Sequence, residues 1–189
     1  MHILAIMGSP RRESNTELLL DATLRGAAEC GATADKIVIC EMNINPCVEC
    51  YACAVDGTCP IPDDMSLIYD QLVSADCVLL ASPIFFYGLT AQAKALVDRC
   101  QALWVRRYML KCWQPDVASR KGALIAVGAT RGARLFDGVL LTAKYFFDAV
   151  GVQFADQLLV KGMEERAQVI DQPGQIDEAV ELGRRLACP

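Results

Sequence analysis

The chain has 189 residues, of which 53% are hydrophobic, so it is long enough for one well-buried core but short for two domains. Its net charge of −5 argues against a nucleic-acid partner and against binding to an anionic membrane surface. No basic leader precedes the first apolar run, and no apolar run approaches the length that spans a bilayer. We therefore expect a cytoplasmic protein with a single domain over residues 1–189.

The chain contains ten cysteines and one histidine. Without an export signal the cysteines are expected to be reduced thiols rather than disulfides, which favours metal or redox chemistry. The lone His2 stands at the start of the first predicted strand and is interpreted as a surface residue. Its isolation argues against histidine acid–base catalysis and against a Cys/His zinc site.

The first predicted strand, residues 2–6, leads into a polar loop over residues 7–17, and a helix follows. Ser14 and Glu17 fit a capping box. Unpaired backbone N–H groups at the positive end of a helix dipole, with hydroxyls and arginines beside them, suit a dianionic phosphate. The loop lacks the Gly-Lys-Ser/Thr ending of a P-loop and the three glycines of a dinucleotide site, so a terminal monophosphate fits better. An ordinary capped helix is the alternative.

Short apolar runs predict four further strands, and helical spacing predicts helices between them. Two of these strands are apolar throughout, as strands covered on both faces should be. The strands are placed at residues 37–40, 77–82, 122–128 and 157–160, and the helices at 18–31, 63–73, 91–104, 135–150 and 175–186.

Residues 41–62 are neither helical nor alternating, and they contain four cysteines. A structureless insertion of this length is uncommon in a domain, so we expect a functional loop. Two residues separate Cys47, Cys50 and Cys53 from one another, and five separate Cys53 from Cys59. This spacing favours a [4Fe–4S] cluster, because closely spaced thiolates can clasp one face of a cubane. Structural zinc or empty reduced thiols are the alternatives.

Strands that alternate with helices predict a doubly wound α/β fold with a parallel sheet and helices on both faces. In such sheets ligands lie beyond the carboxyl ends of the strands, at the switch point. The polar loop 7–17, the aromatic loop 83–87 and the loop 128–132 all follow strand ends, so they should converge on one site. A phosphate loop beside an aromatic loop suits FMN.

On these residues the chain resembles the flavodoxin-like NAD(P)H-dependent FMN reductases, and more narrowly the iron-sulfur flavoproteins. The resemblance spans nearly the whole chain, and it implies a five-stranded sheet of order 2-1-3-4-5. It is carried by Gly8-Ser9-Pro10-Arg11 with Ser14-Asn15-Thr16, by Ser82 to Gly88, and by the four cysteines with Asp63-Asp64-Met65.

By position, the resemblance implies three groups of FMN contacts. Phe86 and Tyr87 could instead be ordinary apolar lining. The phosphate would be held by Ser9, Arg11, Ser14, Asn15 and Thr16; the isoalloxazine would be lined by Pro83, Ile84, Phe85, Phe86, Tyr87 and Gly88; and Ala129 and Thr130 would close its other side.

The resemblance implies a redox enzyme in which FMN carries the chemistry and exchanges electrons with the cluster, so no catalytic side chain is required. The donor would be NAD(P)H or a one-electron carrier such as ferredoxin, and the protein would be a homodimer or homotetramer. A cluster-free NAD(P)H-dependent FMN or quinone reductase is the second hypothesis. A non-catalytic redox sensor or zinc-stabilised module is the third.

The segment 106–121 is basic and aromatic in an otherwise acidic protein. It is either a solvated loop with one buried tryptophan or a docking surface for an acidic carrier. The cysteines outside the cysteine-rich loop are scattered and are expected to be small apolar residues: Cys30, Cys40, Cys77, Cys100, Cys112 and Cys188.

Overall fold

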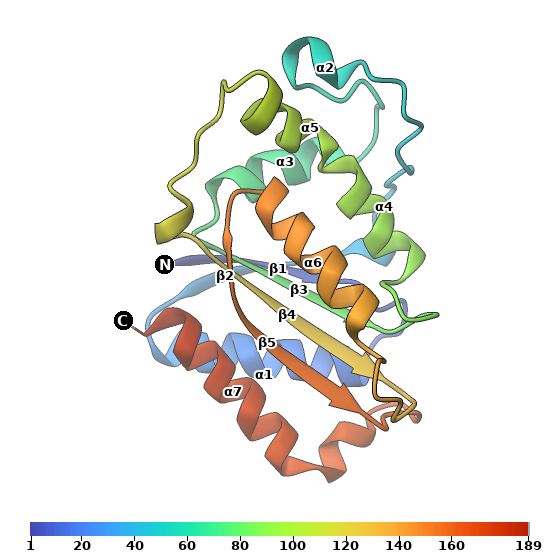
Figure 1. Ribbon diagram of the computed structural model, residues 1–189. Helices are drawn as coiled ribbons and strands as arrows, with labels where there is room; N and C mark the ends of the chain where they lie inside the picture. Colours follow the sequence, from blue (N-terminus) through green and yellow to red (C-terminus); the bar gives the residue numbers. More distant parts are fainter. Residues whose placement is uncertain (189) are drawn as a thin grey trace.

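Five strands form one sheet at the centre of the computed structural model, which describes residues 1–188 (Figure 1). All neighbouring strands are parallel and their order is β2-β1-β3-β4-β5, which confirms the predicted flavodoxin-like α/β fold. The strands are β1 (His2–Met7), β2 (Thr33–Val38), β3 (Cys77–Pro83), β4 (Lys121–Gly128) and β5 (Gln153–Lys161).

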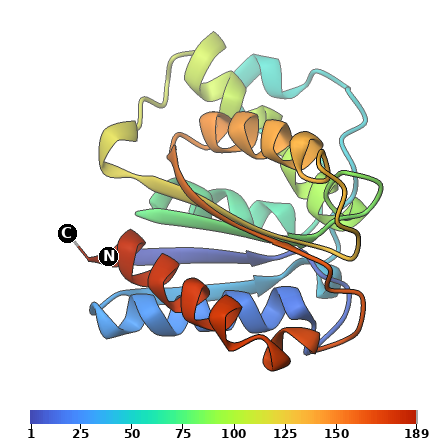
Figure 2. The same ribbon diagram turned by 60° about the horizontal axis from the view of Figure 1, so that its bottom comes forward.

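Helices cover both faces of the sheet (Figures 1 and 2). Alternate residues of β1, β3 and β4 enter two separate cores, so these central strands are apolar along their whole length. One face packs against α1 (Asn15–Glu29) and α7 (Pro173–Ala187). The other packs against α3 (Met65–Ser74), α4 (Ala91–Arg99), α5 (Gln101–Trp104) and α6 (Asp137–Ala149).

The two edge strands begin earlier than their apolar runs predict. β2 begins at Thr33 and β5 at Gln153, whereas the sequence places their starts at residues 37 and 157. Both added segments are largely exposed, because an edge strand needs neighbours on one side only. Polar residues can therefore form the sheet ladder there without producing an apolar run.

The long helix predicted after Gly88 is divided at Cys100, whose N–H is shared between the carbonyls of Leu96 and Val97. It continues through α5 into η2 (Val105–Met109), a turn of π-helix, so the start of the segment expected to be irregular is helical. The predicted cysteine loop also contains one short helix, α2 (Cys53–Asp56), which packs on α5 and η2. The described residues also form short 3₁₀-helices at η1 (Ile39–Glu41), η3 (Val117–Ser119) and η4 (Gln168–Asp171).

The expectation that all cysteines are reduced is wrong for one pair. Cys30 follows α1, Cys188 follows α7, and the two are joined by a disulfide. These helices lie side by side on one face of the sheet, so residues 158 apart in sequence become neighbours. Cys77 and Cys100 are buried as expected, while Cys112 is exposed and Cys40 is only partly buried.

No helix within residues 1–188 combines the length and apolar character needed to cross a membrane.

Candidate functional site

A pocket of about 210 Å³ lies at the carboxyl edge of the sheet, where the loops after β1, β3, β4 and β5 meet. The three loops expected to converge therefore do so. The pocket is lined by the predicted residues Ser9, Arg11, Ser14, Asn15, Thr16, Pro83, Ile84, Phe85 and Ala129.

The first turn of α1 forms one wall of this pocket. Ser14 is the N-cap, and its Oγ accepts the N–H of Glu17 at 3.2 Å. The N–H groups of Asn15 and Thr16 have no intrahelical acceptor, because the first turn of a helix has no preceding carbonyls to bond. These donors lie at the positive end of the helix dipole, which suits an anion.

Only half of the predicted capping box is formed. The carboxylate of Glu17 accepts the N–H of Glu13 at 2.7 Å and also pairs with Arg12 and Lys36. Burial by itself would raise the pKa of Glu17, but Lys36, the Glu13 N–H and Arg12 lower it below its ordinary value. Glu17 thus fixes the shape of the loop through its ionised form.

The two neighbouring arginines of the loop differ in their partners. Arg12 binds Glu17 at 3.0 Å and Glu41 at 2.6 Å, so its charge is already compensated. Arg11 is exposed, lines the pocket and forms no ion pair within residues 1–188. Arg11 is therefore the arginine of this loop whose charge is free for an anionic ligand.

Asn15 contributes to the pocket through its main chain, since its side chain is occupied elsewhere. Its Nδ2 donates to the carbonyl of Glu165 at 2.7 Å, and its Oδ1 accepts the N–H of Val169 at 2.9 Å. These bonds hold the loop after β5, whose residues 163–166 form the wall that sequence reasoning missed. The sequence feature that could have indicated this wall is Gly162, a glycine directly after β5. In the structure its φ is +77°, as a tight turn into the pocket wall requires.

The aromatic loop is a tight hairpin closed by two hydrogen bonds of 3.0 Å between Phe85 and Gly88. Phe86 and Tyr87 between them have φ values of +47° and +64°. This left-handed conformation costs about 1–2 kcal/mol per non-glycine residue and is typical of functional sites. Phe86 is fully exposed, and Phe86, Tyr87, Gly88 and Thr130 do not line the pocket, so these predicted contacts lie outside its walls.

A hydrogen bond links the end of this hairpin to the polar loop 7–17 that follows β1. Thr90 Oγ1 donates to the carbonyl of Gly8 at 2.7 Å, and the Thr90 N–H donates to Ser82 Oγ at 3.3 Å. Both hydroxyl groups are buried. The loop after β1 and the loop after β3 are therefore fixed relative to each other.

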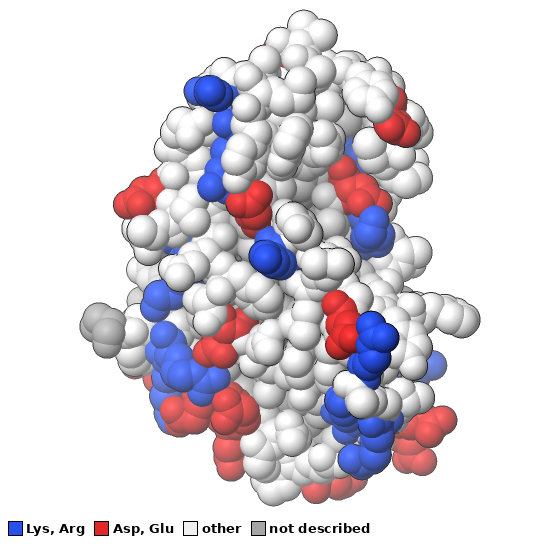
Figure 3. Space-filling model, viewed as in Figure 1, with Lys and Arg blue, Asp and Glu red and all other residues white. Residues whose placement is uncertain are grey.

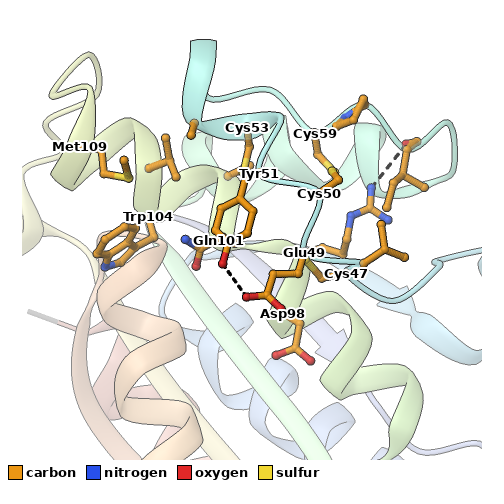
Figure 4. A pocket seen from close by; sticks show the side chains of 17 residues that line it. Cys47, Glu49, Cys50, Tyr51, Cys53, Cys59, Asp98, Gln101, Trp104 and Met109 are labelled. Atoms are coloured by element: carbon orange, nitrogen blue, oxygen red, sulfur yellow. Dashed lines mark hydrogen bonds between the residues drawn. The ribbon is translucent and has the colours of Figure 1, made fainter.

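A second cavity, of about 560 Å³, lies between the cysteine-rich loop and the α4–α5–η2 segment (Figure 4). Cys47, Cys50, Cys53 and Cys59 all line it, so the predicted ligands are brought together. The opposite wall includes Gln101, Trp104 and Met109, and Tyr51 donates to Glu49 at 2.6 Å at one side. The two cavities have no lining residue in common.

Within residues 1–188, no three His, Cys, Asp or Glu side chains are arranged to hold a metal ion. Tetrahedral zinc on four cysteines requires sulfurs about 3.8 Å apart, given Zn–S bonds of about 2.3 Å. Burial raises the pKa of Cys53, and the neighbouring Cys59, Cys47 and Cys50 raise it further. Four cysteine sulfurs that line a cavity of this size fit an iron–sulfur group better than a single ion, and they would bind it as thiolates.

A buried ion pair closes the base of the cysteine-rich loop. Arg99 Nη1 lies 2.6 Å from Asp63 Oδ2, and both side chains are almost fully buried. Asp63 also accepts the N–H groups of Asn45 and Met65, at 2.9 and 3.1 Å. Burial alone would raise the pKa of Asp63, but the Arg99 hydrogen bonds and these two N–H groups lower it. The ion pair thus joins both ends of the loop to α4.

The basic segment 106–121 does not form a continuous positive surface. Arg106 donates to the Gly57 carbonyl at the end of α2, and Arg107 to the Asp148 carbonyl at the end of α6. Arg120 is buried and donates to main-chain carbonyls, including that of Leu72 at 2.6 Å. Positive and negative side chains are interspersed over the face in Figure 3. These arginines therefore stabilise helix ends. The residues around Trp113 form the expected irregular loop, but Trp113 is only partly buried.

The parallel sheet of order β2-β1-β3-β4-β5, with a polar loop and a pocket at its switch point, defines a flavodoxin-like α/β protein. A family model described as NADPH-dependent FMN reductase matches residues 1–152. The chain belongs to this family, which confirms the resemblance seen in its sequence.

Among curated proteins, the chain is 37% identical over 131 residues to an iron-sulfur flavoprotein of Methanocaldococcus jannaschii, and 36% identical over 131 residues to one of Methanosarcina thermophila. Each match covers 69% of this chain but only 64% and 65% of those relatives. Among solved structures, an NAD(P)H:quinone oxidoreductase from Methanothermobacter marburgensis has a TM-score of 0.72 at 19% identity, covering 98% of this chain and 96% of that one. This structural likeness concerns the fold.

Proposed function

We propose that this protein is an FMN-dependent oxidoreductase that passes electrons between FMN in the pocket at the sheet edge and a [4Fe–4S] cluster on Cys47, Cys50, Cys53 and Cys59. The observation that carries the proposal is that these four cysteines line one cavity. The family match and the names of the curated relatives support the same reading.

The residues of the first pocket would bind the FMN phosphate. The N–H groups of Asn15 and Thr16 would donate to its oxygens, and Arg11 would compensate its charge. The hydroxyls of Ser9 and Ser14 lie on the same wall.

Pro83, Ile84, Phe85 and Ala129 would line the ring system, with the exposed Phe86, Tyr87, Gly88 and Thr130 at its margin. A rigid hairpin is suited to this task, because it holds the ring without ordering cost on binding.

When bound, FMN supplies transfer of one or two electrons and the cluster supplies one-electron transfer. The cysteine-rich loop would provide the thiolates, and the Arg99–Asp63 pair would hold the loop closed around the cluster. Trp104 and Met109 would exclude water from one side of the cavity. No side chain is required to move a proton in this scheme.

NAD(P)H or a one-electron carrier such as ferredoxin would supply the electrons, in a cytoplasmic homodimer or homotetramer. A cluster-free NAD(P)H-dependent FMN or quinone reductase is the second candidate. The observation that favours it is the absence, in the part of the chain that the structure describes, of a preformed arrangement of metal ligands. No three possible ligands within the described residues 1–188 are positioned to hold a metal ion.

An absorption spectrum with iron and zinc analysis tests the proposal on anaerobically purified and reconstituted protein. We expect flavin bands, a broad iron–sulfur absorption and about four irons per chain. Flavin without iron would replace the proposal with the cluster-free reductase. Zinc without flavin would favour the third hypothesis, a zinc-stabilised module.

A further inference from the structure

Arg99 has one hydrogen-bond donor that its structural role does not use. A guanidinium carries five N–H groups. Nη1 donates to the Asn45 carbonyl at 2.9 Å and to Asp63 at 2.6 Å, while Nη2 donates to Asp63 at 3.1 Å and to the Ile61 carbonyl at 3.4 Å. The fifth donor, Nε–H, is buried and has no partner within the described part of the chain.

A buried donor without an acceptor costs about 1–3 kcal/mol, and more when the group is charged. Buried N–H groups without a partner are rare in native proteins, so an acceptor for the Arg99 Nε–H is expected. Arg99 is 2% exposed, so bulk water does not supply one.

The cavity beside Arg99 supplies a candidate acceptor. Arg99 lines the cavity of the four cysteines. Among these, Cys59 is partly buried, packs against the adjacent core and lines the same cavity as Arg99. The position of Arg99 at the end of α4 is fixed by its four other hydrogen bonds, so its side chain cannot turn away from the cavity.

We propose that Arg99 is a positioning residue for the metal centre, and that its Nε–H donates a hydrogen bond to the Cys59 sulfur when that sulfur is a metal-bound thiolate. This inference rests on the proposed function, because it assigns a role toward the cluster to a residue of this chain.

Two consequences follow from this hydrogen bond. It stabilises the more negative, reduced state of the cluster and so raises its reduction potential, since donors to the ligating sulfurs tune such centres. It also couples the metal centre to the closed base of the loop, because the same guanidinium binds Asn45, Ile61 and Asp63.

R99K tests this inference, with R106K as its matched control. Lysine at 99 can retain the ion pair with Asp63 but has no Nε–H fixed beside the cavity. Arg106 braces the same loop, but its Nε already donates to the Gly57 carbonyl at 2.8 Å. We expect R99K to lower the reduction potential of the cluster and to accelerate iron loss to a chelator by about 10- to 100-fold. We expect R106K to leave the potential unchanged.

The possible results separate this inference from the proposed function. If the wild type holds iron but R99K retains its potential and its rate of iron loss, the inference is wrong and the proposed function stands. An equal shift in R106K would also overturn the inference, since loosening of the loop would then explain the effect. A wild type that holds no iron after reconstitution would overturn both.

A crystal structure of the loaded wild type provides a measurement that does not depend on the folding of a variant. The distance between Arg99 Nε and the Cys59 sulfur should then be within hydrogen-bonding range. A distance well beyond about 4 Å would overturn the inference.

Discussion

Arg11 and Arg12 are adjacent in the chain, but only Arg11 has a charge free for a ligand. Arg12 is bound to Glu17 and Glu41. We expect R11A to weaken FMN binding by about 1.5–3 kcal/mol, roughly 10- to 150-fold in Kd, because a charge-assisted hydrogen bond is lost. A fluorescence titration of the metal-free protein with FMN would measure this.

The control is R12A, which removes a charge that is already compensated. It should weaken FMN binding much less than R11A does. Equal effects of the two substitutions, or no effect of R11A, would show that the phosphate does not bind at this loop.

The cysteines provide a second residue-scale prediction. C50S should abolish or strongly reduce iron binding, because a hydroxyl is a poor replacement for a soft thiolate ligand. FMN affinity should be retained, since the two cavities share no lining residue. Iron analysis after anaerobic reconstitution, together with an FMN titration, would test both statements.

Cys100 provides the comparison. It lies at the junction of α4 and α5, and burial raises the pKa of its thiol above the ordinary value. C100S should leave the iron content unchanged. Full iron content in C50S would exclude Cys50 as a ligand.

At the scale of the elements, α1 and α7 approach so closely that their glycines are required. A Cβ on Gly183 would lie 1.9 Å from the carbonyl oxygen of Thr23, and one on Gly26 would lie 2.0 Å from that of Val180. Both obstacles are backbone, so they cannot rotate away. We expect G183A to lower the free energy of unfolding by about 1–3 kcal/mol.

Gly174 offers a control in the same helix, since no atom lies within 4 Å of a Cβ placed there. G174A should change the free energy of unfolding by less than about 1 kcal/mol, in line with helix propensity. Denaturant unfolding of both variants would test the comparison. Similar stabilities for G183A and the wild type would contradict the close packing of the two helices.

The Arg99–Asp63 pair makes the stability of the cysteine-rich loop depend on pH. The pKa of Asp63 is lowered in the folded protein, so the pair stabilises the fold above the ordinary aspartate pKa of about 3.9 and loses this contribution as the pH falls further. D63N should be less stable at pH 7 by about 3–5 kcal/mol, because it leaves a buried charge unpaired. Its stability should also fall less steeply below about pH 4.

Unfolding free energies measured between pH 2 and pH 7 would test this pH dependence. D64N is a suitable control, since Asp64 accepts the N–H of Asn43 without a buried arginine beside it. A D63N curve parallel to that of the wild type would show that Asp63 does not carry the acid dependence.

At the scale of the whole molecule, several large apolar side chains are exposed on and around α5 and α6. Leu141 and Tyr145 lie one turn apart on α6, and Trp104 and Tyr145 line a common cavity between α5 and α6. Together with Tyr108, whose ring packs against Trp104, they provide apolar surface of the kind that marks protein interfaces. We expect a homodimer or homotetramer that buries this surface.

Light scattering at micromolar concentration should give a mass of at least two chains. L141D should shift the protein toward the monomer, because a charge would be buried in the interface. A monomeric wild type would contradict this prediction.

The strand order came from the family resemblance, whereas the sequence by itself determined the fold class and most of the residues that meet at the sheet edge. These features depend on local signals: apolar runs at β1, β3 and β4, a capped helix after β1, and the rule that parallel strands bring their carboxyl ends to one edge. The spacing of the four cysteines is also a local signal. It predicted that they act together, and the structure brings all four to one cavity.

Only the tertiary structure decided which side chains are free to act. Asn15 binds the loop after β5, Arg12 is paired with carboxylates, and Arg120 is buried beneath helix ends. Cys30 meets Cys188 because α1 and α7 pack together, and Arg99 reaches the cysteine cavity because α4 ends beneath it. Each of these depends on contacts between residues distant in the chain, and a sequence read for local periodicity carries no signal for such contacts.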